Sequence, residues 1–91
     1  MYGSSKVYVN VTADFDPDGL MLPKEIVWED GCRYEIDKVR EVRMAAAMTG
    51  GGYGDRYSIV VNGKPTYIFF ERSFNRTGNN IGRWFVERRR A

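Results

Sequence analysis

The sequence predicts an all-β domain: a five- to six-stranded antiparallel meander that forms a small, SH3-like or otherwise partly open barrel. Three observations lead to this class. Val7, Val9 and Val11 alternate with polar or aromatic residues, which is the period of a half-buried strand. Two further pairs of alternating runs are each joined by a glycine turn, Asp30-Gly31 and Asn62-Gly63. Such dipeptides favour tight β-hairpins because glycine adopts positive φ without steric cost.

The first part of the chain divides into a strand, a loop and a hairpin. Residues 6–13 form the strand, and residues 14–19, which are dense in turn formers, make the loop. The hairpin covers residues 26–37 around Glu29-Asp30-Gly31. Its alternation puts apolar side chains on one face and charged ones on the other, as in a half-buried antiparallel pair. The apolar face carries Trp28, Tyr34 and Ile36, and the charged face carries Arg33, Glu35 and Asp37.

Residues 37–49 fit two interpretations. Val39, Val42, Ala45 and Ala46 have helical spacing, whereas Val42, Met44, Ala46 and Met48 alternate as in a strand. Asp37 could cap a helix at its start and Gly50 could end it. We favour a strand to about Met44, followed by a loop, because no breaker separates this segment from the preceding strand.

The rest of the chain adds a hairpin and a final strand. Residues 57–61 and 67–70 flank the Asn62-Gly63 turn, a polar linker follows at 71–82, and residues 83–87 form the last strand. We expect one domain over residues 1–91, with flexible ends at 1–5 and 88–91. The predicted interior consists of Val7, Val9, Val11, Ile26, Trp28, Tyr34, Ile36, Val42, Tyr57, Ile59, Phe69, Trp84 and Val86.

The net charge of +2 conceals an asymmetry along the chain. Residues 1–45 carry six Lys and Arg against nine Asp and Glu, a net of −3, while residues 46–91 carry eight against three, a net of +5. Such polarity can attract anionic partners or support head-to-tail association. It also cancels if the two halves interleave in one barrel, which is the interpretation we favour.

Composition limits the chemistry. The chain has no histidine and a single cysteine, Cys32, so neither a disulfide within the chain nor a zinc site of the usual ligands can form. No apolar run is long enough for a signal peptide or a membrane span, so we expect a cytoplasmic protein with no membrane partner. Gly50 to Gly54 lacks the Lys-Ser/Thr of a phosphate-binding loop and predicts a hairpin connection.

Residues 14–25 match the formula of a calcium-binding loop, with carboxylates at positions 1, 3, 5 and 12 and glycine at position 6. The candidate ligands are Asp14, Asp16, Asp18 and Glu25. A calcium-binding EF-hand needs a helix on each side, whereas a strand precedes this loop. Turn chemistry alone explains the same residues, so a weak divalent-cation site is the lesser interpretation.

Catalysis has little support. Cys32 has no histidine to act as its base, and Glu29, Asp30, Glu35 and Asp37 cluster around a hairpin where cross-strand ion pairs are expected. We therefore predict a non-catalytic interaction or structural module that needs no cofactor. Its partner is another protein or a second copy, which would bind through the aromatic strand at 67–70 or an open sheet edge.

The alternative is a small barrel that binds single-stranded nucleic acid. Such barrels stack bases on exposed aromatic rings within a basic groove. The residues that could supply both features are Tyr8, Tyr53, Arg56, Phe70, Arg72, Arg83, Phe85 and Arg88. Against this, the net charge is small and no RNP-like or KH-like motif is present.

Several segments together resemble a family of short bacterial proteins. They are Trp28-Glu-Asp-Gly31, Tyr34-Glu-Ile-Asp37, Arg56-Tyr57, Thr66-Tyr67-Ile-Phe69 and Gly82-Arg-Trp-Phe-Val-Glu87, and the resemblance covers most of residues 6–87. The family is a domain of unknown function, so the resemblance implies a small β domain in a bacterial cytoplasm and no site residues.

Overall fold

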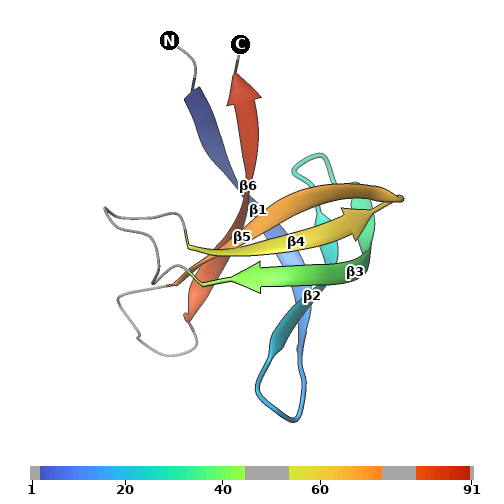
Figure 1. Cartoon of the computed structure of the whole chain (residues 1–91). Coiled ribbons are helices and arrows are strands. Elements are labelled where there is room, and N and C mark those ends of the chain that lie inside the picture. The colour runs from blue at the N-terminus through green and yellow to red at the C-terminus, as the bar shows by residue number, and fades with distance from the viewer. Residues whose placement is uncertain (1–2, 45–53, 73–79, 91) are drawn as a thin grey trace.

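A computed structural model describes residues 3–44, 54–72 and 80–90, which form strands and connecting turns and contain no helix (Figure 1). Six antiparallel strands follow one another around a closed barrel, and β1 and β6 complete the ring. The strands are β1 Gly3–Phe15, β2 Met21–Val27, β3 Arg33–Arg43, β4 Asp55–Val61, β5 Lys64–Arg72 and β6 Gly82–Arg90. The all-β class and the antiparallel meander are thus confirmed, and the strand interpretation holds for β3 up to Arg43.

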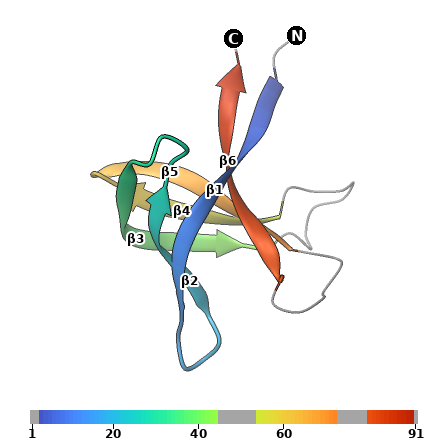
Figure 2. The ribbon, with the colours of Figure 1, turned by 180° about the vertical axis from the view of Figure 1, so that it is seen from behind.

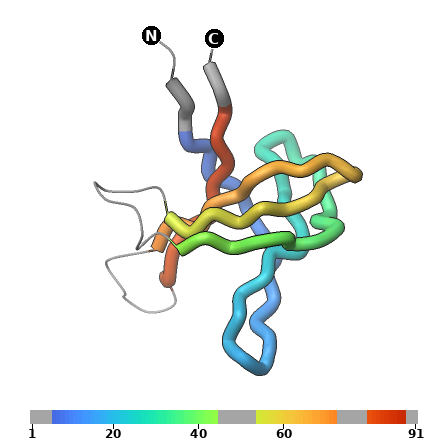
Figure 3. The backbone as a smooth tube through the Cα atoms, in the orientation of Figure 1, coloured from blue at the N-terminus to red at the C-terminus, as the bar shows by residue number. Residues whose placement is uncertain are grey.

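The long strand β1 belongs to two ladders. Its residues Gly3 to Val9 pair with β6, and its residues Asn10 to Phe15 pair with β2. The ends of β1 and β6 consequently project from one side of the barrel as a two-stranded ribbon, here called the arm and defined as residues 3–7 and 86–90 (Figures 1 and 2). The β1–β2 hairpin projects from the opposite side, and β1 can be followed from one projection to the other (Figure 3).

The strands of the arm extend into the segments 1–5 and 88–91, for which we expected flexible ends. Gly3, Ser4 and Ser5 pair with Arg90, Arg89 and Arg88, so both strands extend beyond their predicted limits. The sequence concealed this pairing because neither Gly-Ser-Ser nor Arg-Arg-Arg alternates apolar with polar residues.

Aromatic side chains dominate the barrel interior. The indole ring of Trp84 lies 5.0 Å from the ring centroids of both Tyr57 and Phe70. The buried core cluster consists of Ile26, Ile36, Tyr57, Ile59, Ile68, Phe70 and Trp84, against which Val9, Val11, Ala13, Met21, Val39, Val61 and Val86 pack. The Tyr57 hydroxyl donates a hydrogen bond to the Met21 carbonyl at 3.0 Å, which ties β4 to β2 across the barrel.

Five predicted interior positions differ from the structure. Val7 and Trp28 are half-buried, and neither belongs to the core cluster or packs on it. Tyr34 and Val42 are 38% and 40% exposed. Both lie on β3, which pairs with β2 only from Arg33 to Glu35, so Val42 has no β2 strand beside it. Phe69 is buried, but it packs on Phe85 on the face of the sheet that points away from the core cluster, and Phe70 takes the interior place.

The two predicted hairpins form with the expected turns. Asn62 and Gly63 both have positive φ, 51° and 74°, as a tight two-residue turn requires. In the other hairpin, the Gly31 amide donates to the Trp28 carbonyl and the Trp28 amide to the Cys32 carbonyl.

Gly54 precedes β4 with a φ of +123°, and a Cβ at this position would collide with the Phe70 carbonyl. Gly54→Ala should lower the free energy of unfolding by about 3 kcal/mol or more, because backbone strain and a backbone clash add together. Gly31→Ala is the matched control: its φ is also positive, but a Cβ there meets no atom within 4 Å. The control should cost about 1–2 kcal/mol, and urea unfolding of both variants tests the difference.

Candidate functional site

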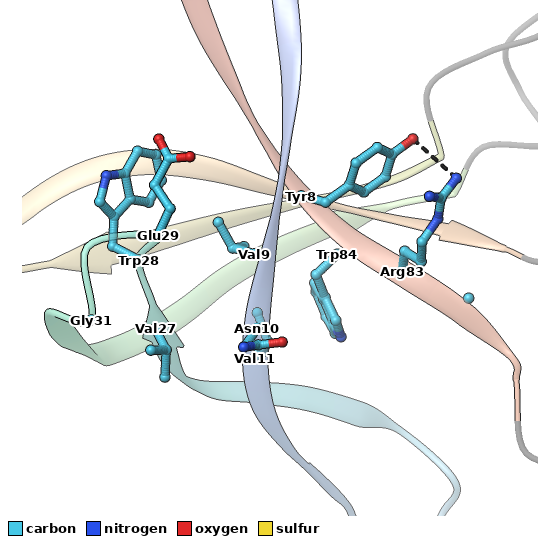
Figure 4. A pocket seen from close by; sticks show the side chains of 11 residues that line it. Tyr8, Val9, Asn10, Val11, Val27, Trp28, Glu29, Gly31, Arg83 and Trp84 are labelled. Atoms are coloured by element: carbon cyan, nitrogen blue, oxygen red, sulfur yellow. Dashed lines mark hydrogen bonds between the residues drawn. The ribbon is translucent and has the colours of Figure 1, made fainter.

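An open groove of about 640 Å³ crosses β1 where that strand changes partner. Three segments line it: Tyr8–Val11, the end of β2 with its turn, and Gly82–Trp84 at the start of β6. Trp28 and Glu29 lie on one side of β1, and Tyr8, Arg83 and Trp84 lie on the other (Figure 4). We call this feature the β1 groove. It contains both tryptophans of the chain.

On the Trp28 side, the arm contacts the turn between β2 and β3. The Arg88 guanidinium lies 5.6 Å from the Trp28 ring centroid and donates a 2.8 Å hydrogen bond to Glu29 Oε1. Both charged side chains are about half exposed. The turn itself is stiffened because Asp30 Oδ1 accepts from the Cys32 amide at 2.9 Å. Trp28 is therefore held between the barrel and a cation from the opposite end of the chain.

On the Tyr8 side, a polar network surrounds an exposed aromatic ring. The Arg83 guanidinium lies 4.0 Å from the Tyr8 ring centroid and also donates to the Tyr8 hydroxyl at 3.3 Å (Figure 4). The Tyr8 hydroxyl donates to Glu71 Oε1 at 2.7 Å, and Lys6 Nζ donates to Glu71 Oε2 at 3.4 Å. Since Tyr8 is 41% exposed, its ring remains accessible from solvent.

The network shifts two pKa values in opposite directions. The hydrogen bond from Tyr8, followed by the charges of Lys6 and Arg83, lowers the pKa of Glu71 despite some desolvation. The same hydrogen bond, together with burial and the Glu71 charge, raises the pKa of Tyr8. Tyr8 therefore stays a protonated donor and Glu71 an ionised acceptor around neutral pH.

The predicted nucleic-acid residues do not share one surface. Tyr8 and Arg83 meet at the β1 groove and Arg88 flanks it, whereas Arg56 lies on β4 with its guanidinium 4.6 Å from the Tyr67 ring centroid. The Nε atom of Arg56 is buried and has no hydrogen-bond partner in the part of the chain that the structure describes. Tyr53 lies outside the described residues.

Phe70 and Phe85 are buried, with 7% and 0% exposure, so neither ring can stack on a base. Phe70 belongs to the core cluster, and Phe85 stacks on Phe69 with centroids 5.0 Å apart and planes 7° apart. Arg72 is engaged elsewhere: its Nε and Nη2 donate to the buried carboxylate of Asp55 at 3.2 and 3.0 Å. Such a pair fixes the end of β5 against the start of β4.

Two of the four candidate calcium ligands have other hydrogen-bond partners in the structure. Asp16 Oδ1 accepts from the backbone amides of Asp18 and Leu20, each at 2.9 Å, which closes the turn. Glu25 lies on β2 and accepts from Arg33 Nη1 at 2.8 Å. Among the residues that the structure describes, no three acidic, cysteine or histidine side chains group to hold a metal ion. Turn chemistry accounts for the loop, and the Glu25–Arg33 pair is a cross-strand ion pair of the expected kind.

Sequence reasoning placed Trp28 in the interior and Glu29 among local ion pairs. Both instead face Arg88, which is 59 residues from Glu29 in the chain. Cys32 is exposed, and a hydrogen bond with Asp30 raises the pKa of its thiol, which is the opposite of what activates a nucleophile.

No protein-family model matches the sequence, and neither a curated protein nor a solved structure matches the chain. Within the described ranges, no helix has the length and apolar character needed to cross a membrane.

Tyr8→Phe should raise the pKa of Glu71 towards its ordinary value of 4.5, because the hydrogen bond from Tyr8 is the largest cause of the depression. A depressed folded-state pKa contributes stability above pH 4.5 that is lost as the pH falls through the folded value. The variant should therefore lose less stability below that pH than the wild type does. Carbon NMR titration of the Glu71 carboxyl, with urea unfolding at each pH, tests both statements.

The control for this titration is Tyr67→Phe, which changes a half-exposed tyrosine on the same strand as Glu71. An unchanged Glu71 pKa in Tyr8→Phe would contradict the assigned cause.

Proposed function

We propose that this protein is a non-catalytic interaction module that binds an acidic, apolar-bearing segment of a partner protein in the β1 groove. One observation carries the proposal: Tyr8 and Trp28, together with the largely buried Trp84, line a groove that Arg83 and Arg88 flank. Aromatic rings supply apolar contact area at low entropic cost, and they are enriched with arginine at the centres of protein interfaces.

Charge supports an acidic partner. The arm carries four basic residues, Lys6 and Arg88 to Arg90, against the single acidic residue Glu87, a net of +3. The side chains of Arg83 and Arg88 are 63% and 52% exposed, so both can turn towards a bound carboxylate. Exposed cations of this kind mainly raise the rate of encounter and select the sign of the partner.

A non-catalytic role is supported by what surrounds the groove. The chain has no histidine, and the charged side chains there, Glu29, Glu71, Arg83 and Arg88, form ion pairs with one another. Paired groups of this kind hold strands together and offer no free general base with a matched acid.

Intrinsic fluorescence reports on the groove directly, because both tryptophans line it. A blocked hexapeptide in which aspartate alternates with phenylalanine and leucine should change the tryptophan emission in a saturable way. The same peptide with lysine in place of aspartate should not. Arg83→Gln/Arg88→Gln should weaken the binding of the acidic peptide by about three- to tenfold, as expected for the loss of two exposed charge contacts.

The matched control is Arg33→Gln/Arg43→Gln, which removes two exposed arginines that do not line the groove. Equal binding of the acidic and basic peptides, or no binding of either at millimolar concentration, would overturn the proposed function.

A second candidate function, single-strand nucleic-acid binding, is favoured by the exposed Tyr8 ring with Arg83 stacked on it. This pair provides one stacking position beside the basic arm. A fluorescent oligonucleotide should then bind with an affinity that falls steeply with salt, and Tyr8→Ala should weaken it by about 1 kcal/mol or more. Tyr67→Ala serves as the control on another exposed tyrosine. Absence of binding at low salt excludes this candidate.

A further inference from the structure

The tip of the β1–β2 hairpin, residues 14–20, exposes apolar side chains that the fold does not use. Phe15 and Leu20 are 66% and 58% exposed, and neither belongs to the core cluster or packs on it. Three aspartates and no basic residue accompany them in this segment, a net charge of −3. An apolar pair among carboxylates is the kind of segment that the β1 groove is proposed to bind.

The tip is also ordered before it meets any partner. Asp16 Oδ1 accepts from two backbone amides, the Asp16 amide donates to the Leu20 carbonyl, and the Gly19 amide donates to the Asp16 carbonyl, all at 2.9 Å. These bonds set the backbone between Phe15 and Leu20. A preorganised loop loses less conformational entropy on binding than a flexible one does.

The tip and the arm lie at opposite ends of the molecule (Figure 1). Their net charges, −3 and +3, are opposite in sign and equal in size. Because β1 runs from one to the other, the acidic tip cannot fold back onto its own arm. Contact between the two therefore requires a second molecule.

We propose that the hairpin tip of one copy docks in the β1 groove of a second copy, with Phe15 and Leu20 against the groove aromatics and the aspartates facing Arg83 and Arg88. This inference rests on the proposed function and names its partner. The contact joins two different surfaces, so each pair keeps a free tip at one end and a free groove at the other. Association is then head to tail and extends with concentration.

Two full-length variants separate the surfaces. Phe15→Ser/Leu20→Ser removes the apolar tip and keeps the groove, while Arg83→Glu/Arg88→Glu reverses the groove cations and keeps the tip. In sedimentation velocity at low salt, the wild type should show an average mass that rises with concentration, and added salt should reduce it. Each variant alone should remain monomeric. An equimolar mixture of the two should form a one-to-one heterodimer, because one intact tip meets one intact groove.

Circular dichroism and thermal unfolding confirm that both variants fold, and Arg83→Gln/Arg88→Gln replaces the charge reversal if that variant does not. Tyr67→Ser, at a 50% exposed position on β5, is the control and should associate as the wild type does. A mixture that stays monomeric, or a tip variant that associates like the wild type, overturns the inference.

Adding the acidic hexapeptide to the tip variant distinguishes failure of the self-association from failure of the proposed function. The tip variant could bind the peptide while the wild type stays monomeric at all concentrations. The groove then binds acidic segments but not a second copy, and only the proposed self-association is refuted. If the tip variant binds no peptide and the wild type is monomeric, both the self-association and the proposed function are refuted.

Discussion

The structure depends on the exchange of partners that β1 makes between Val9 and Asn10. Up to Val9 the strand is hydrogen-bonded to β6, and from Asn10 it is hydrogen-bonded to β2. A strand that served one ladder only would leave either the barrel open or the ends of the chain unpaired. The exchange closes the ring, extends the arm on one side and the hairpin on the other, and leaves between β6 and β2 the space that forms the groove.

The barrel does not mix the charges of the two halves of the chain. Its strands follow one another in sequence order, so β1 to β3 of the acidic half and β4 to β6 of the basic half occupy separate parts of the ring, and the expected interleaving is wrong. The charges also do not cancel locally, because the tip of the β1–β2 hairpin and the arm both extend beyond the strands that could neutralise them. The net of −3 at one end comes from the aspartates of the β1–β2 hairpin tip, and the net of +3 at the other comes mainly from the arginines at the end of β6.

Local sequence patterns predict the strands and turns, but they do not predict which face of β5 points into the barrel. The Asn62-Gly63 turn and the alternation in β1 and β4 depend on neighbouring residues only, so they can be predicted. Tyr67 to Phe70 is apolar on both faces, and alternation there cannot tell which phenylalanine faces the core. The pairing of Phe69 with Phe85 and of Phe70 with Trp84 decides it, and that pairing is a property of the sheet. The nucleic-acid prediction lost Phe70 for this reason, and it lost Phe85 because that side chain packs on Phe69 on the other face of the sheet.

The candidate site was beyond sequence reasoning for a related cause. Trp28 has the alternation of a core residue, yet it lines the groove, where the Arg88 guanidinium lies near its ring. Arg88 reaches Trp28 because β6 continues past the barrel, and β6 continues because the polar ends of the chain pair with each other. The arm, which has no alternating apolar pattern, thereby brings Arg88 to Trp28 at the edge of the groove. Such a site forms where a strand continues beyond its alternating apolar residues. The pairing of strands in the folded sheet then reveals the site, and the local sequence pattern does not.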